Sequence, residues 1–96
     1  MLKIYGVSLE LVKELAPVVE AIGRRDVDLA RQLRRSVSSV VLNVAEGSES
    51  KGGNRLARYH DALGSAQEAR ASLEVAVAWG YLCAGYPSGS RIGFVR

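Results

Sequence analysis

The chain has 96 residues, of which 48% are hydrophobic and 24% are charged, and its formal net charge is +3. This length suits one small domain, and the apolar content is sufficient for a core. Cys83 is the only cysteine, which excludes an internal disulfide and a cysteine-based metal cluster. No apolar run suits a membrane span and the N-terminus lacks a secretory signal pattern, so we expect a cytoplasmic protein.

The first predicted helix runs from Ser8, as its N-cap, to about Ile22, just before Gly23. Its apolar residues recur at the spacing of one helical face, at Leu11, Leu15, Val18 and Ile22. Pro17 lies inside this pattern and removes one backbone donor. We therefore expect a kink there or, alternatively, two shorter helices.

The second predicted helix runs from an N-cap at Asp26 to Glu46 and stops at Gly47, in the left-handed conformation of a C-cap. Its side chains form three faces rather than two. The apolar face spans an arc of roughly 80° and consists of Leu29, Leu33, Val37, Val40 and Val44. The polar stripe on its flank consists of Gln32, Ser36, Ser39, Asn43 and Glu46. The remaining side carries Arg31, Arg34, Arg35 and Ser38.

The polar stripe of this helix permits a ligand site or a structural role. We favour a buried or half-buried seam at a helix or subunit contact, made by Ser36, Ser39 and Asn43, because Asn43 can bond across helices and fix their register. Glu46 has no nucleophile or metal partner nearby in the sequence. We therefore expect it to pair with an arginine of a neighbouring helix.

A third helix is predicted from an N-cap at Asn54 to about Tyr81, after a flexible loop at residues 47–53. Its apolar stripe is mostly alanine, which lets neighbouring backbones approach closely. Gly64 costs this helix about 0.5–1 kcal/mol relative to alanine, so we expect a close contact there. We expect Trp79 in the core or at an interface, with stacking on RNA bases as the alternative.

The middle of the chain is basic, with eight basic residues against four acidic ones between Arg24 and Arg58. This charge permits an anionic partner but does not require one, because surface arginines are common on helices. The residues that we assign to a nucleic-acid-binding surface are Arg31, Arg34, Arg35, Lys51, Arg55 and Arg58. Free amides at the start of the third helix, beside Lys51 and Arg55, are a further candidate phosphate contact.

Two segments carry a family resemblance: SVSSVVLNVAEG at residues 36–47 and ALGSAQEARASLEVAVAWGYL at residues 62–82. They resemble the bacterial four helix bundle protein family, whose members include proteins encoded within intervening sequences of large-subunit ribosomal RNA genes. The accessory variability determinant of diversity-generating retroelements is a relative. The resemblance covers roughly residues 8–82, and its most specific parts are Asn43-Val-Ala-Glu46-Gly47 and Gly64-Ser-Ala-Gln-Glu68.

The resemblance implies an up-down-up-down bundle that assembles into a ring, usually a pentamer. It also implies a link to RNA or, in the retroelement relative, to nucleic acid and a reverse transcriptase, and it implies no catalytic activity. The chain departs from the family in one respect. After a bundle domain at residues 1–82, residues 83–96 form an irregular tail instead of a fourth helix, and a truncated or frame-shifted reading frame would produce such a tail.

We therefore predict an all-α, up-down bundle of three helices that forms a homo-oligomer and binds RNA or DNA with little sequence specificity. No paired carboxylates, metal-ligand spacing or nucleophile–base set is visible, so we expect neither an enzyme nor a cofactor. Self-association follows because a missing fourth helix would leave on the order of 10–20 kcal/mol of apolar burial unrealised. The alternative is a scaffold that docks a helix of a partner protein in the uncovered groove. The residues assigned to structural or interface roles are Ser36, Ser39, Asn43, Glu46, Gly47, Gly64, Glu68 and Trp79.

Overall fold

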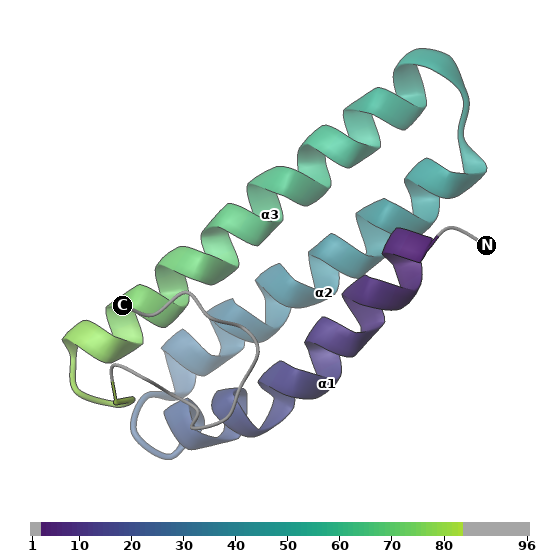
Figure 1. Ribbon diagram of the computed structural model, residues 1–96. Helices are drawn as coiled ribbons and strands as arrows, with labels where there is room; N and C mark the ends of the chain where they lie inside the picture. Colours follow the sequence, from purple (N-terminus) through teal and green to yellow (C-terminus); the bar gives the residue numbers. More distant parts are fainter. Residues whose placement is uncertain (1–2, 84–96) are drawn as a thin grey trace.

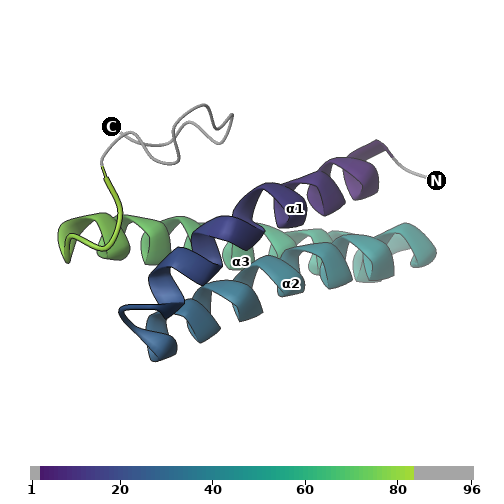
Figure 2. The same ribbon diagram turned by 90° about the horizontal axis from the view of Figure 1, so that it is seen from below.

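The computed structural model describes residues 3–83, and this part of the chain contains three α-helices and no strand. The helices are α1 (Lys3–Gly23), α2 (Val27–Glu49) and α3 (Gly52–Ala78). α3 runs back along α2, and α1 packs on α2 from another side and diverges from α3 toward its own N-terminus (Figures 1 and 2). The predicted all-α fold with three helices is confirmed for this part of the chain.

The first helix begins at Lys3 rather than at Ser8. Ser8 is a buried residue within the helix, and its hydroxyl donates a hydrogen bond of 2.7 Å to the carbonyl oxygen of Tyr5. The helix continues through Pro17 without ending, so the alternative of two shorter helices is wrong. Leu15 and Val18 are buried on either side of the proline, so the helix packs against the core both just before and just after it.

The N-cap of α2 is as predicted, because the Asp26 carboxylate accepts a hydrogen bond of 2.9 Å from the amide of Leu29. The predicted end at Gly47 is wrong, since the helix continues to Glu49. Gly47 is buried inside the helix, and a Cβ atom at this position would overlap the ring of Tyr59. The glycine therefore allows close approach of α3 and does not cap the helix.

Only Ser50 and Lys51 separate α2 from α3, so the connection is much shorter than the predicted loop. Gly52, the first residue of α3, has a φ of 58°, a conformation that glycine adopts without strain. The predicted cap at Asn54 is wrong, because Lys51 occupies the N-cap position and makes no side-chain cap bond. A positive-φ glycine makes the sharp turn here, which the sequence pattern had assigned to Gly47.

A Schellman motif ends α3 at Ala78, before the predicted end near Tyr81. The amide of Tyr81 donates to the carbonyl oxygen of Ala76, and the amide of Gly80 donates to that of Val77, both at 2.9 Å. Gly80 has the φ of 85° that this motif requires. The cap fixes the backbone that follows the helix.

The core lies where the C-terminal half of α1, the N-terminal half of α2 and the C-terminal half of α3 meet, and we call this region the closed end. Its largest fully buried side chains are Ile22, Leu33 and Leu73. The rest of this cluster consists of Leu15, Val18, Val19, Ala30, Val37, Ala69 and Ala76. The core therefore draws on all three helices.

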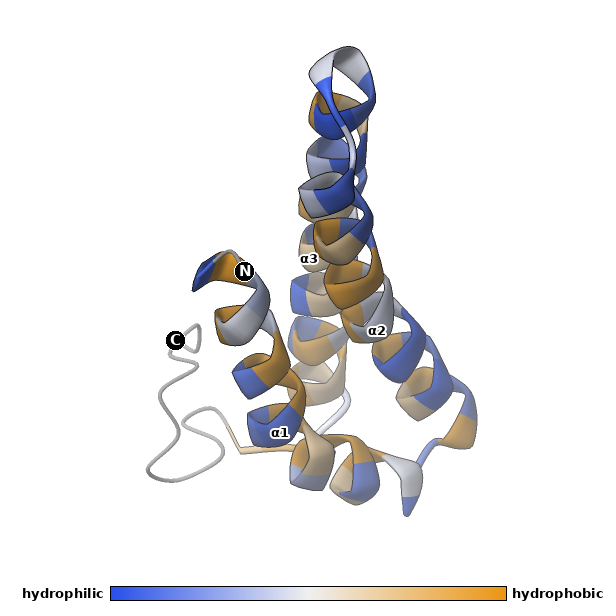
Figure 3. Ribbon diagram, turned by 90° about the vertical axis from the view of Figure 1, so that its right-hand side faces the viewer, coloured by the Kyte–Doolittle hydropathy of each residue, from blue (hydrophilic) through white to orange (hydrophobic). Residues whose placement is uncertain are grey.

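The opposite region, which we call the open end, consists of the N-terminal halves of α1 and α3 and the α2 segment between them. Here Ile4 and Val7 of α1 are 53% and 60% exposed, and Leu56 and Leu63 of α3 are 63% and 57% exposed. Figure 3 shows the N-terminal half of α1 standing apart from the other helices, with apolar positions along it. Three helices therefore cover one end of the bundle and leave the other uncovered.

The segment at 83–96, which we predict to be irregular, lies outside the described residues apart from the exposed Cys83. Within residues 3–83, no helix combines the length and the apolar character needed to cross a bilayer.

Candidate nucleic-acid interface

The structure divides the six predicted basic residues into two groups. Arg31, Arg34 and Arg35 lie in the first half of α2, beside the closed end. The other three, Lys51, Arg55 and Arg58, lie where α2 is joined to α3. The 16 positions between Arg35 and Lys51 correspond to roughly 24 Å along a helix axis. The six residues therefore do not form one site within a single chain.

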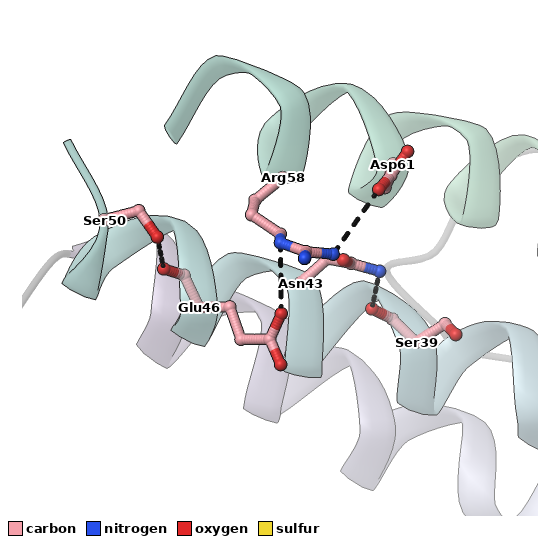
Figure 4. A network of polar contacts seen from close by, with 6 residues as sticks. All are labelled: Ser39, Asn43, Glu46, Ser50, Arg58 and Asp61. Carbon is pink, nitrogen blue, oxygen red and sulfur yellow. Dashed lines mark hydrogen bonds and ion pairs between the residues drawn. The ribbon is translucent and has the colours of Figure 1, made fainter. Parts of the chain in front are cut away.

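Carboxylates offset the charge of the second group. The Nε atom of Arg58 lies 3.2 Å from Oε1 of Glu46, and its Nη1 atom lies 3.7 Å from Oδ2 of Asp61 (Figure 4). Arg58 is thus the arginine partner on a neighbouring helix that the sequence predicts for Glu46. The Nε atom of Arg55 donates to the carbonyl oxygen of Ser50 at 3.1 Å, and Lys51 is exposed. The charge of this group is therefore offset in part, at Arg58, whereas Lys51 and Arg55 have no carboxylate within 4.0 Å in residues 3–83.

The first group is less compensated. Arg31 lies 3.7 Å from the carboxylate of Asp28, but both side chains are largely exposed, so this pair is weak. Arg34 and Arg35 have no carboxylate oxygen within 4.0 Å in residues 3–83. These two guanidinium groups are the cations of α2 most available to an anionic partner.

Arg24 joins this group, although the sequence patterns did not select it. A solvent-open hollow of about 420 Å³ lies at the corner between α1 and α2 and is lined by Arg24, Arg31 and Arg34. Glu20 is the acidic residue of its lining. The basic composition of residues 24–58 included Arg24, but the residue lies in a connection, and helical periodicity assigns such residues to no face. The position of Arg24 relative to Arg31 and Arg34 depends on the angle between α1 and α2, which helical periodicity does not give.

The polar stripe of α2 lies half-buried against α3. Ser36 and Ser39 line an open hollow of about 380 Å³ together with Gln32, Arg35 and Glu68 of α3. The Ser36 hydroxyl donates to the carbonyl oxygen of Gln32 at 2.9 Å, within its own helix.

The amide of Asn43 also bonds within α2. It donates to the carbonyl oxygen of Ser39 at 3.0 Å (Figure 4). Within this chain, Asn43 therefore does not make the contact across helices that we expected. Its amide does not fix the register of α2 against α3.

Gly64 and Trp79 are placed differently from our expectation. A Cβ atom at Gly64 would meet no atom within 4 Å, and the residue is exposed, so its expected close contact is not made within one chain. Trp79 is 67% exposed and is no core residue. The cause is the same for both, because α3 packs on α2 through another face, which buries Ala62 and Ala69.

The side chains of this surface have a chemistry that suits anions. Among residues 3–83, no group of three His, Cys, Asp or Glu side chains is placed to hold a metal ion. Guanidinium groups are donors without acceptors and match phosphate oxygens in geometry. The exposed arginines of the closed end can therefore bind phosphates without any rearrangement of the core.

A model of a protein family described as "23S rRNA-intervening sequence protein" matches residues 1–85, a range that includes all three helices. This match confirms the family resemblance of residues 36–47 and 62–82. Comparison with curated proteins and with solved structures gave no match.

Proposed function

Because the chain belongs to the 23S rRNA-intervening sequence protein family, we propose that it is a non-enzymatic, oligomeric bundle that binds RNA in the cytoplasm. The binding residues, which we call the arginine group, are Arg24, Arg31, Arg34 and Arg35. One observation carries the proposal: Arg24, Arg31 and Arg34 line one solvent-open hollow, and Arg34 and its neighbour Arg35 have no carboxylate within 4.0 Å in residues 3–83.

The proposed binding rests on phosphate contacts and has little sequence preference. For a single strand, each phosphate that the protein neutralises makes the slope of log K against log salt more negative by about 0.7. Four arginines on one chain therefore predict a slope that is no steeper than about −3. Repetition of the arginine group in an oligomer would make this slope steeper.

The test is retention of a labelled RNA across a salt series by three proteins: the wild type, Arg34→Glu/Arg35→Glu and the matched control Lys51→Glu/Arg55→Glu. The two double variants change the net charge equally. We expect the first to lower affinity at low salt by at least tenfold, because reversal both removes phosphate contacts and repels phosphates. The control should retain most of the affinity, because Lys51 and Arg55 lie where α2 is joined to α3, at the other end of α2 from the hollow that Arg24, Arg31 and Arg34 line.

Three outcomes contradict the proposal: no retention at low salt, retention that does not fall with salt, and equal losses in the two double variants. DNA of the same length serves as the competitor. Equal competition by DNA would show that the protein binds nucleic acid in general, and the arginine group would remain the proposed site.

The proposed oligomer rests on the open end. Burial of one large aliphatic side chain is worth about 1.5–3 kcal/mol, and Ile4, Val7, Leu56 and Leu63 are all more than half exposed in one chain. A second copy that covers these residues would realise that free energy. The family resemblance implies a ring, usually a pentamer. The number of subunits is to be determined by measuring the mass in solution.

The same surface supports a second candidate function, a scaffold that binds an amphipathic helix of a partner protein. The uncovered apolar side chains of α1 and α3 are the observation that favours it. The variants separate the two functions. A protein partner should tolerate Arg34→Glu/Arg35→Glu and be lost with Leu63→Glu, whereas RNA binding should show the larger loss with the arginine variant.

A further inference from the structure

Trp79 is a large aromatic side chain left in solvent at the closed end, and it is the most exposed of the large hydrophobic side chains in residues 3–83. It is 67% exposed, although it follows directly on a helix whose preceding turn contributes the fully buried Ala76. One side of the indole is engaged by Tyr81, at 6.4 Å between ring centroids and 19° between planes. Such spacing is typical of an offset aromatic stack.

The aromatic pair is held rigidly on the fold. The Schellman motif fixes the backbone from Ala76 to Tyr81. The Tyr81 hydroxyl donates a hydrogen bond of 3.1 Å to Oδ2 of Asp26, whose other oxygen caps α2. The ring of Tyr81 also packs against the core. The position of Trp79 is thus determined before any ligand arrives, which lowers the entropy cost of binding.

One cation lies against this pair, and others lie at the same end of the bundle. The guanidinium of Arg25 lies over the Tyr81 ring, with Cζ 5.5 Å from its centroid. Arg24, its neighbour in the chain, lines the basic hollow together with Arg31 and Arg34. Arg31 is five residues along from Asp26, or roughly 7.5 Å along the axis of α2. An aromatic face and several phosphate-binding groups therefore occur together at one end of the bundle.

We propose that the outer face of Trp79 stacks on an unpaired nucleobase, while Arg24 and Arg25 contact the phosphates that flank it. The inference rests on the proposed RNA binding and narrows it to a single-stranded segment. In a duplex, neighbouring base pairs cover the faces of each base, whereas loops and single strands leave them free to stack on aromatic side chains. An exposed and immobilised indole beside arginines has the chemistry of such a site.

Trp79 is the only tryptophan of the chain, so its fluorescence reports on this site alone. The wild type is titrated with three probes of equal length: a single-stranded oligouridylate, a duplex RNA, and an abasic oligonucleotide that has phosphates without bases. We expect the oligouridylate to quench the emission of Trp79. The duplex and the abasic probe should leave the emission unchanged even where they bind.

The same probes are then applied to Trp79→Ala and to Trp79→Phe, with helix content checked by circular dichroism. Loss of one stacked base is worth about 5- to 150-fold in affinity. Trp79→Ala should therefore bind the oligouridylate about 5- to 150-fold more weakly, and Trp79→Phe should fall between it and the wild type. Affinity for the abasic probe should not change.

The outcomes separate this inference from the proposed function. If oligouridylate binds but neither quenches Trp79 nor loses affinity in Trp79→Ala, stacking is wrong and the arginine group stands. If Trp79→Ala instead lowers the solution mass and leaves RNA binding intact, the indole is a protein contact and stacking is again wrong. If no probe binds at low salt, both the stacking and the RNA-binding proposal are wrong. The quenching measurement on the wild type decides the matter even where a variant fails to fold.

Discussion

The two ends of the bundle are built from the same helices with the same apolar pattern, but they differ in how far their apolar side chains are buried. On α1, Ile4 lies 11 residues before Leu15, and Val7 lies 11 residues before Val18, so each pair is offset by only about 20° around the helix. Yet Leu15 and Val18 are both 2% exposed, whereas Ile4 and Val7 are 53% and 60% exposed. The apolar stripe of α1 is continuous, but only its C-terminal half is buried against the other helices.

This difference indicates a division of tasks. The closed end is stable from within and presents unpaired arginines and a fixed tryptophan to solvent. At the open end, Arg58 is paired with carboxylates and several aliphatic side chains are uncovered. We infer that the closed end suits a polyanion and the open end suits another helical surface.

The largest expected effect is a loss of stability when a core side chain of the closed end is truncated. Leu33 is fully buried in the core, in the N-terminal half of α2, so Leu33→Ala should cost about 2–5 kcal/mol of the free energy of unfolding. Urea unfolding followed by circular dichroism measures it. The matched control is Leu56→Ala at the open end, which should cost no more than about 0.5 kcal/mol in dilute solution, where the chain is a monomer. Equal costs under those conditions would contradict the distinction between the ends.

A second prediction concerns the contact of α2 with α3. A Cβ atom at Gly47 would overlap the ring of Tyr59, so Gly47→Ala should destabilise the fold by about 1–3 kcal/mol. In a Tyr59→Ala background the ring is absent. The same glycine substitution should then stabilise by about 0.5–1 kcal/mol, because alanine favours the helix. Unfolding free energies of the four proteins test this reversal, and a glycine cost that is the same in both backgrounds would contradict it.

A smaller effect is expected at the ion pairs of the open end. Arg58, Glu46 and Asp61 are about half exposed, so Arg58→Gln should lower the free energy of unfolding by less than about 1 kcal/mol. Its RNA affinity should stay close to that of the wild type, because the charge is already offset. A loss of RNA affinity as large as that of Arg34→Glu/Arg35→Glu would show that the whole basic sequence acts as one surface.

The smallest effect is a pH dependence at the closed end. Partial burial raises the pKa of Tyr81, and its hydrogen bond to Asp26 and the charge of Asp26 act in the same direction, against a smaller lowering by Arg25. A phenol whose pKa is raised by folding stabilises the fold below its ordinary pKa of about 10 and loses this contribution as the pH rises through the folded value. The phenolate absorbance of the wild type minus that of Tyr81→Phe should therefore titrate above pH 10. A difference curve with a midpoint at or below 10 would contradict this.

The sequence was sufficient for the helices and their inward faces. The i, i+4, i+7 spacing of Leu11, Leu15 and Val18 predicted the buried side of α1, and Asp26 was recognised as the cap of α2. The ends of the helices were less accurate. Gly47 and Gly80 are both glycines near a helix end, and only backbone geometry separates one that admits a neighbouring ring from one that adopts a positive φ.

The site depended on information that periodicity does not contain. A helical wheel placed Arg31, Arg34 and Arg35 on one side, but it could not pair Arg58 with Glu46, because that contact joins two helices. It also gave no position to Arg24, which lies in a turn. Trp79 was expected in the core or at an interface because it is large and apolar, but it is exposed in one chain, because α3 packs on α2 through another face.

The most direct test of the division between the ends is the mass in solution by light scattering, at tens of micromolar, of the wild type, Leu63→Glu and the control Leu42→Glu. Leu42 is 62% exposed but lies nine residues from Leu33, on the opposite side of α2 from the core. We predict a defined multiple of 10.3 kDa for the wild type and for Leu42→Glu, and a folded monomer for Leu63→Glu. A wild type that stays at 10.3 kDa would contradict the account, because the exposed apolar side chains of its open end would then not drive association.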